Sequence, residues 1–318
     1  MSARRQAYLL PDPTRRRSGA ELFQQTVPRA LVHRSAVSEV LVTGVRHGDD
    51  GVHQVGAQWS RAHSYYGPVA GRWHDPMIFA ETIRQACMLL AHQTLAIPLT
   101  HPFLTATHAF TILESGMRLT DRPANVLLEI SLHDVVRRGA NVSSFACSIN
   151  AFREGEPIGI GRSSANCVSP SVYRRLRGPR FGAVPRGEVP APLPHELAGR
   201  SRPSDVVLGR SPGKRTWVLR AETSHPILFD HPVDHVPGMV LMEAARQAAL
   251  LTVGCPDGLL VSCAATFRRY VEFDAPCIVS SSPPREEAPG RHALTVTFHQ
   301  AESLVGSCEV TVLDSRAA

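Results

Sequence analysis

Apolar residues along the chain follow two kinds of pattern. In residues 143–149 they alternate with polar ones, which is typical of a strand with one buried face. Residues 76–93 and 238–253 are apolar around nearly the whole circumference of a helix, which predicts two buried helices. The predicted strands are 37–46, 53–59, 105–113, 126–135, 143–152, 157–167, 215–222, 259–270, 277–282, 293–300 and 303–313. A helix followed by antiparallel strands, twice over, predicts an α+β fold with a sheet wrapped around a central helix.

The two helical segments are copies of one another. Glu-Thr-Ile-Arg-Gln-Ala at 81–86 recurs as Glu-Ala-Ala-Arg-Gln-Ala at 243–248, with four of six positions identical. The copies are 162 positions apart, and at the same separation His63 matches His225. A repeat of this quality predicts two copies of one unit of about 130 residues, an ordinary domain size.

The distribution of proline divides the chain into four parts. Residues 169–204 are rich in Pro with interspersed Gly and Arg, and proline is excluded from helix interiors and central strands. This segment is therefore predicted to be a linker or an extended strap. Residues 1–29 are expected to form a flexible tail, which leaves a first domain at 30–168 and a second at 205–318.

Composition excludes several classes of protein. No apolar run reaches the ~18–20 residues of a membrane span, and no apolar signal segment follows Met1. Seven scattered cysteines without a C-x-x-C pair argue against a zinc ribbon or a disulfide framework and favour a reducing cytoplasm. The chain has no glycine-rich phosphate loop and no histidine cluster with zinc-ligand spacing, so neither a nucleotide cofactor nor a metal is expected.

Positive charge is carried almost entirely by arginine. Lys+Arg number 34 against 28 Asp+Glu, a net charge of +6, and Lys214 is the only lysine. The excess is typical either of nucleic-acid binding or of a GC-rich genome. The arginines are dispersed and no predicted helix has a basic reading face, so the genomic explanation is favoured and no nucleic-acid partner is expected.

A polar stripe interrupts each apolar helix. Its members stand at i, i+3 and i+4 and so share one face. Burying a carboxylate costs several kcal/mol unless it is paired, so the stripe is either an internal ion pair or the edge of an active site. Its presence in both copies favours the active site. The stripes are Glu81, Arg84 and Gln85 in the first copy, and Glu243, Arg246 and Gln247 in the second.

A turn whose residues suit catalysis or ligand binding precedes the second helix. Residues 229–238 read Phe-Asp-His-Pro-Val-Asp-His-Val-Pro-Gly. Gly238 allows close approach of the backbone, and the free N–H groups of a helix start can bind a carbonyl or phosphate oxygen. Asp230 and His231 stand beside this turn, where a histidine serves as a base or donor, or simply caps the turn.

These motifs resemble known families. His231 to Glu243 is similar to the active site of the hotdog-fold β-hydroxyacyl-carrier-protein dehydratases, although the spacing is slightly shorter. The tandem chain resembles more closely the A-factor synthase (AfsA) family of γ-butyrolactone signal biosynthesis, over residues 30–315. The motifs that carry this resemblance are Tyr-Tyr-Gly-Pro-Val-Ala-Gly-Arg-Trp-His-Asp-Pro at 65–76, the stripe at 81–86, and residues 229–247.

The resemblance implies two tandem hotdog domains that form a pseudodimer. The implied activity is transfer of a β-ketoacyl group from acyl carrier protein to dihydroxyacetone phosphate, the first step of butenolide-type signal synthesis, without a cofactor, by a monomer or homodimer. The alternatives are a hotdog dehydratase or thioesterase, and a non-catalytic regulator that binds an acyl ligand. The implied catalytic residues are Glu81, Arg84, Glu243 and Arg246. Residues expected to bind substrate are His231, Asp230, Gly238, Gln247, Gln85, His63 and His225.

The reaction requires a base, an oxyanion donor and a cation for the phosphate. A glutamate of the stripe could be the base if burial raises its pKa, the helix start at Gly238 could stabilise the oxyanion, and an arginine could bind phosphate. Val69 stands where the second copy has His231, so the two sites are expected to differ. By analogy with dehydratase dimers, His231 is expected near Glu81 rather than Glu243.

Overall fold

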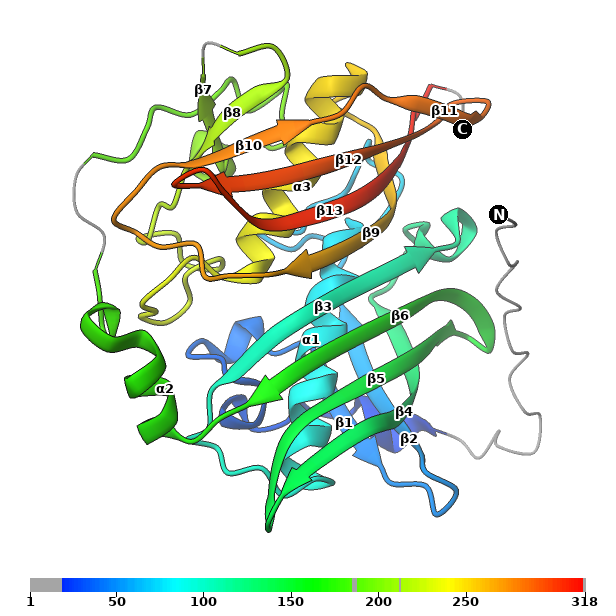
Figure 1. The fold of residues 1–318 in the computed structure, drawn as a ribbon. Coiled ribbons are helices and arrows are strands. Elements are labelled where there is room, and N and C mark those ends of the chain that lie inside the picture. Colours follow the sequence, from blue (N-terminus) through cyan, green and yellow to red (C-terminus); the bar gives the residue numbers. More distant parts are fainter. Residues whose placement is uncertain (1–18, 185–187, 212, 317–318) are drawn as a thin grey trace.

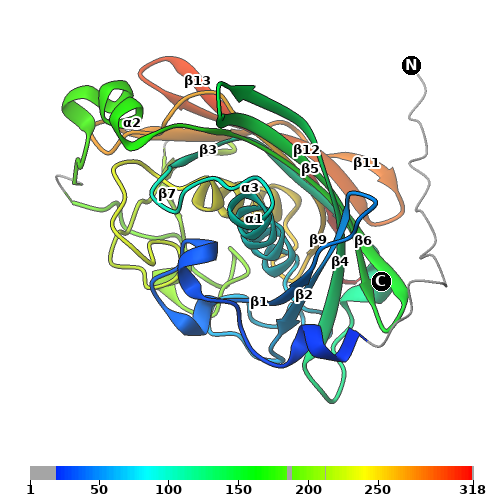
Figure 2. The ribbon, with the colours of Figure 1, turned by 90° about the horizontal axis from the view of Figure 1, so that it is seen from below.

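The fold is a single curved sheet that encloses two helices. The computed structural model describes residues 19–184, 188–211 and 213–316. In these residues 13 antiparallel strands form one sheet, and α1 (Pro76–Gln93) and α3 (Gly238–Val253) lie inside its curve (Figures 1 and 2). Both helices have the bounds that the sequence pattern predicts, and the expected α+β fold with a sheet wrapped around central helices is confirmed.

The two halves of the sheet correspond to the two copies of the sequence repeat. The order is β1-β2-β4-β5-β6-β3-β9-β13-β12-β10-β8-β7, so the halves are related about the β3–β9 pair, where Ala109 lies opposite Ala264. The first half consists of β1 (Val42–Arg46), β2 (Val52–Trp59), β3 (Phe103–Ile112), β4 (Ala124–Arg138), β5 (Asn141–Arg153) and β6 (Glu156–Cys167). The second consists of β7 (Leu208–Arg210), β8 (Thr216–Leu219), β9 (Leu259–Phe267), β10 (Cys277–Ser281), β11 (Arg285–Ala288), β12 (Arg291–Gln300) and β13 (Ser303–Leu313).

Local sequence fixes the ends of these elements. Asp75 caps α1 by accepting a hydrogen bond from the Met77 N–H, and Pro76 occupies the first helical position, where no N–H is needed. Gly254 ends α3 in the left-handed conformation at φ 76°. The β5–β6 turn has positive φ at both Glu154 and its neighbour Gly155, as a tight hairpin requires.

The segment between the two halves contains structure that its prolines did not indicate. Ser169 caps a short helix, α2 (Pro170–Arg177), that begins on a proline. Arg177 is buried and forms ion pairs with Asp234 and Glu272, which attach α2 to the second half. The short 3-10 helices of the chain are η2 (Gly19–Phe23), η3 (Arg29–Val32), η4 (Val37–Glu39), η5 (Glu114–Met117), η6 (Gly178–Arg180) and η7 (Pro203–Asp205).

The N-terminal region packs onto the sheet from Gly19. Most of the expected tail, residues 1–18, lies outside the described residues. Leu22 of η2 is buried against β1 and β2, where Gly44 and Gly56 leave room: a Cβ on Gly56 would lie 2.5 Å from the Leu22 carbonyl oxygen. Across the described residues, no helix combines the length and apolar character needed to span a membrane.

Candidate active site

The stripe glutamate of the second domain is held by two arginines. Glu243 is fully buried, and Arg246 donates to both of its carboxylate oxygens at 2.9 Å. Arg200 donates to the same two oxygens, at 2.8 and 2.5 Å. The predicted i,i+3 pair of Glu243 and Arg246 is thus only part of the cluster. The carboxylate accepts four charge-assisted hydrogen bonds, two from each arginine.

The first domain contains the same arrangement. Arg84 donates to the two oxygens of Glu81 at 2.8 and 2.7 Å, and Arg34 lies 2.7 Å from its Oε1. The Glu81 half-site (Arg34, Glu81, Arg84, Gln85) and the Glu243 half-site (Arg200, Glu243, Arg246, Gln247) are therefore related by the repeat.

A second repeat in the sequence could have revealed the extra arginines. Arg-Ser-Ala-Val-Ser-Glu-Val-Leu at 34–41 matches Arg-Ser-Arg-Pro-Ser-Asp-Val-Val at 200–207. The two segments are 166 positions apart, whereas the helices are 162 apart, so a comparison at one fixed separation misses them. The short repeated motif Arg-Ser-x-x-Ser-acid-Val is the sequence feature that identifies Arg34 and Arg200.

The stripe glutamines hold these arginine segments against the helices. Gln85 donates to the Glu39 carbonyl and to Glu81, each at 2.7 Å, and accepts from the Leu41 N–H at 2.8 Å. Gln247 makes the matching contacts in the second domain. Both hydrogens of each side-chain amide are thus engaged by protein oxygens.

The repeated histidines occupy matching positions in the loops. His63 Nδ1 accepts from the N–H groups of Tyr65 and Tyr66, and its Nε2 lies 3.4 Å from Glu39. His225 holds the corresponding loop of the second domain and lies 3.2 Å from an acidic side chain there. In the structure, both imidazole rings therefore stabilise the loops to which they belong.

Each half-site crosses the domain boundary. Arg34 of the first domain donates to the Ile227 carbonyl of the second at 2.9 Å. Arg200, in the segment that precedes the second domain, donates to the Tyr65 carbonyl of the first at 2.8 Å and pairs with Asp75 at 3.0 Å. The two clusters therefore lock the domains together as well as neutralising their glutamates.

The arginines keep both glutamates ionised. Burial by itself raises the pKa of Glu243, but Arg200 and Arg246 outweigh it and lower the pKa to about 2. Glu81 is shifted in the same direction, because Arg34 and Arg84 outweigh its burial and lower its pKa. The expectation that burial would raise a stripe pKa toward neutrality is wrong, since sequence spacing had supplied only one arginine per glutamate.

A pocket opens beside the Glu81 half-site. It has a volume of about 480 Å³, and its lining includes Arg34 and Arg84 but neither Arg200 nor Arg246. The side chain of Arg84 is 18% exposed, whereas that of Arg246 is 4% exposed. The expected difference between the two sites is therefore visible as one open and one closed half-site.

The second domain supplies the opposite wall of this pocket. Asp230, His231 and Gly238 all line it, and the Asp230 carboxylate accepts hydrogen bonds from the Ser35 and Ala36 N–H groups at 2.6 and 3.0 Å. The His231 side chain is 43% exposed. His231 thus lines the same pocket as Arg34 and Arg84 of the first domain's half-site.

The two helix starts also differ, and the start that is free of a side-chain cap is the one at the pocket. Asp75 and Pro76 close the start of α1, whereas no side chain caps the start of α3 at Gly238. A Cβ at Gly238 would lie 3.0 Å from the Phe267 ring, so any larger residue there would require the ring to move by a few tenths of an ångström. The uncapped N–H groups of α3 therefore lie beside the pocket, on the positive end of the helix dipole.

Comparison with known proteins decides the family. Residues 16–169 and 184–313 match the family model of the A-factor biosynthesis hotdog domain, AfsA. A 2-oxo-3-(phosphooxy)propyl 3-oxoalkanoate synthase of Streptomyces coelicolor is 40% identical over 295 residues, which are 91% of this chain and 93% of that protein. One of Streptomyces virginiae is 39% identical over 283 residues, 89% and 96% of the two chains. The chain belongs to the AfsA family.

Solved structures support the fold of this AfsA-family chain. The 12:0-ACP thioesterase from Umbellularia californica superposes with a TM-score of 0.52 at 11% identity, over 84% of this chain and 98% of that one. An acyl-ACP thioesterase from Bacteroides thetaiotaomicron gives 0.50 at 12% identity, over 84% and 100%. At this identity the likeness concerns the fold alone, and with the family match it confirms the tandem hotdog architecture.

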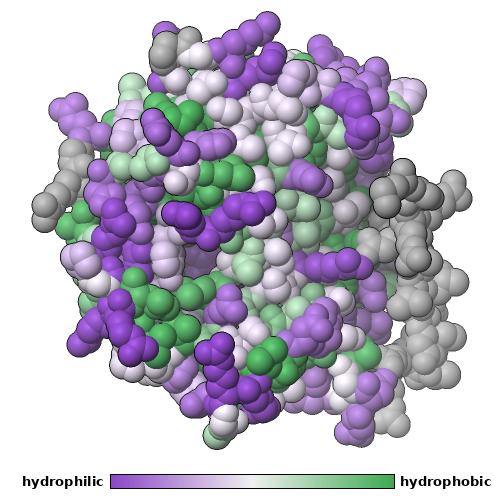
Figure 3. Space-filling model, viewed as in Figure 1, coloured by the Kyte–Doolittle hydropathy of each residue, from purple (hydrophilic) through white to green (hydrophobic). Residues whose placement is uncertain are grey.

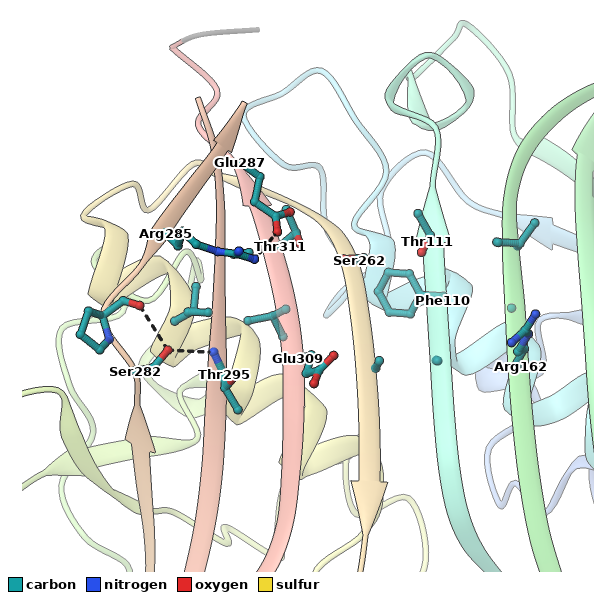
Figure 4. Close-up of a pocket in the computed structure, with 18 residues that line it drawn as sticks. Phe110, Thr111, Arg162, Ser262, Ser282, Arg285, Glu287, Thr295, Glu309 and Thr311 are labelled. Atoms are coloured by element: carbon teal, nitrogen blue, oxygen red, sulfur yellow. Dashed lines mark hydrogen bonds and ion pairs between the residues drawn. The ribbon is translucent and has the colours of Figure 1, made fainter. Parts of the chain in front are cut away.

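A second hollow lies on the outer face of the sheet. Its volume is about 650 Å³, and its lining includes Arg162 and Glu309 (Figure 4), which pair across the strands with Ala109 and Ala264. The outer face is mostly pale over these middle strands, with hydrophilic and hydrophobic groups mixed around them (Figure 3). The described lining contains none of the predicted site residues of the AfsA-family motifs, so the smaller pocket is the candidate active site.

Proposed function

We propose that this chain transfers a β-ketoacyl group from acyl carrier protein to a hydroxyl of dihydroxyacetone phosphate. The relatives are named 2-oxo-3-(phosphooxy)propyl 3-oxoalkanoate synthase, a name that describes the resulting ester. The ester is the first intermediate of γ-butyrolactone-type signal synthesis. The observation that carries this proposal is one pocket with arginines on one wall and an uncapped helix start on the other.

Arg84 is the proposed ligand of the phosphate group. Its Nε and Nη2 are committed to Glu81, but Nη1 has only the Met88 sulfur as a partner among the described residues, at 2.9 Å. A thioether is a weak acceptor, so a phosphate oxygen gains by replacing it. Arg34 then neutralises Glu81 while Arg84 binds phosphate, which removes the conflict of one arginine serving both groups.

The start of α3 is the proposed oxyanion site. N–H groups at an uncapped helix start carry partial positive charge, and here they border the pocket at Gly238 and Met239. Donors placed where negative charge develops on the thioester oxygen stabilise the tetrahedral intermediate. The start of α1 is less suited to this role, because the Asp75 side chain already accepts from the Met77 N–H there.

The rest of the pocket suits an acyl chain on a carrier protein. Apolar side chains make up much of the lining, as expected for a fatty acyl group. Arg268 and Arg269 are exposed and line the same pocket, so they offer positive charge to an acidic carrier protein at its mouth. The apolar lining residues include Met88, Phe103, Leu241, Met242, Phe267 and Val271.

Product analysis tests the proposal. The purified full chain is given a β-ketoacyl carrier protein with and without dihydroxyacetone phosphate, and the products are followed by mass spectrometry. A phosphorylated ester, formed only when the acceptor is present, is the expected result. Release of free β-keto acid at the same rate without acceptor identifies a thioesterase and contradicts the proposal, as does saturable acyl binding without turnover at every chain length.

A further inference from the structure

His33 occupies an unusual backbone position at the pocket. It ends η3 in the left-handed conformation at φ 50°, where a non-glycine residue is uncommon. The same turn places its neighbour Arg34 on Glu81, and the His33 side chain lines the pocket together with Arg84. Glycine adopts this conformation without strain, so the backbone itself does not require a histidine here.

The second domain lacks this residue. At the separation of 166 positions that relates the arginine segments, His33 corresponds to Gly199, which has the same left-handed conformation at φ 63°. His92, which contacts His33, corresponds to Gly254 at the separation of the helices. The closed half-site therefore has glycine at both positions, and the open half-site has a pair of histidines.

Hydrogen bonding determines which nitrogens of this pair carry protons. His92 Nδ1 lies 2.7 Å from the Ile97 carbonyl oxygen, which can only accept, so Nδ1 carries the proton. In neutral His92, Nε2 is then an acceptor. It lies 2.9 Å from His33 Nε2, so His33 donates from Nε2 and keeps an unprotonated Nδ1.

The surroundings hold the ring in place and keep it neutral. The two imidazoles stack with centroids 5.0 Å apart, and Phe103 lies edge-on to His33 at 5.4 Å. Burial, and then His92, Arg84 and His231, lower the pKa of His33 to about 4. At neutral pH the His33 Nδ1 lone pair is thus available, whereas the stripe glutamates are committed to their arginines.

We propose that His33 is the general base of the acyl transfer and that His92 is the positioning residue that fixes its tautomer. This inference rests on the proposed function. His33 Nδ1 takes the proton of the acceptor hydroxyl as that oxygen bonds to the thioester carbon. The tetrahedral intermediate collapses, the C–S bond breaks, and the leaving sulfur takes the proton from Nδ1. The products are the ester and the carrier-protein thiol, and His33 returns to its neutral form.

Replacement of His33 tests the catalytic role. Glycine suits the left-handed backbone, as Gly199 shows, so His33→Gly leaves the turn unstrained. We expect ester formation to fall about 10²–10⁴-fold, the usual contribution of a general base, and added imidazole to restore part of it. The matched control is His133→Asn, an exposed histidine on β4, which should keep the wild-type rate.

Two further measurements separate this inference from the proposed function. In ¹⁵N-labelled wild-type protein, the histidine spectrum should show His33 at neutral pH protonated at Nε2 and not at Nδ1. His92→Phe removes the acceptor, so His33 should then populate both tautomers and kcat should fall with little change in KM. If the wild type forms ester and the rate of His33→Gly lies within threefold of the wild-type rate, only the assignment of His33 as the base is overturned. A proton on Nδ1 of His33 in the wild type at neutral pH would also overturn that assignment alone. A wild type that forms no ester overturns the proposed function and the inference with it.

Discussion

Replacing Glu243 by glutamine isolates the energetic contribution of the closed half-site. The variant keeps the shape of the side chain but leaves Arg200 and Arg246 facing a neutral amide in a fully buried position. Arginines do not lose their protons at neutral pH, so the cost is an uncompensated buried charge. We therefore expect the Gln variant to fold less stably.

The pKa of Glu243 sets the size of this effect. It falls from its ordinary value of 4.5 to about 2 on folding, and each pKa unit corresponds to ~1.4 kcal/mol, so ionised Glu243 stabilises the fold by about 3 kcal/mol at pH 7. Because the folded pKa is the lower one, this stabilisation is present above pH 4.5 and is lost as the pH falls through about 2. By pH 3 less than half of it should remain.

Urea unfolding of wild type and Glu243→Gln at pH 7 and at pH 3 measures both quantities. We expect the difference in free energy of unfolding to be about 3 kcal/mol at pH 7 and to shrink at pH 3. Glu309→Gln, on the exposed face of β13, is the matched control and should change stability by less than ~0.5 kcal/mol. Equal stability of wild type and Glu243→Gln at pH 7 would refute the electrostatic account of the half-site.

Four further outcomes follow from the structure. Arg84→Met should raise the KM for dihydroxyacetone phosphate more than that for the acyl donor, measured by varying each substrate in turn. Gly238→Ala should lower kcat about 10–100-fold, because its Cβ would press on Phe267 and displace an oxyanion donor; circular dichroism should show the fold intact. The pH profile of kcat/KM should stay level from pH 8 to pH 5 and fall near pH 4, where His33 becomes protonated; a fall near pH 6.5 would contradict it. Arg177→Ala should release α2 to limited proteolysis, since two buried ion pairs are lost; an unchanged digestion pattern would show that α2 is held by other contacts.

The sequence was most informative where periodicity and burial agree. The helices at 76–93 and 238–253 are apolar around nearly the whole circumference, a pattern typical of a buried helix, and both have the predicted bounds. Short edge elements were less predictable. β7 has three residues and β11 four, too few for a pattern to exceed chance, and α2 begins on a proline that also marks linkers.

The site was predictable only to the extent that it is local in sequence. The i,i+3 partners of each glutamate lie on one helix face and could be read directly. Arg34 and Arg200 come from segments 47 and 43 positions away, and only folding brings them to the carboxylates. Without them the charge balance, and therefore the direction of both pKa shifts, could not be derived.

The His33–His92 contact shows the same limit. The two histidines are 59 positions apart, and neither belongs to a motif of the repeated stripe. The tautomer depends on a backbone carbonyl at Ile97, which has no signature in sequence. A comparison of the two domains makes the pair visible, because glycine replaces both histidines in the closed half.

The central claim is that one composite pocket transfers an acyl group to a phosphorylated hydroxyl compound. The most direct measurement supplies ¹³C-labelled dihydroxyacetone phosphate and β-ketoacyl carrier protein to the full chain and follows the label by mass spectrometry. The account predicts a labelled phosphorylated ester, formed in step with release of the free carrier-protein thiol. Thiol release with the label still entirely in dihydroxyacetone phosphate would contradict it.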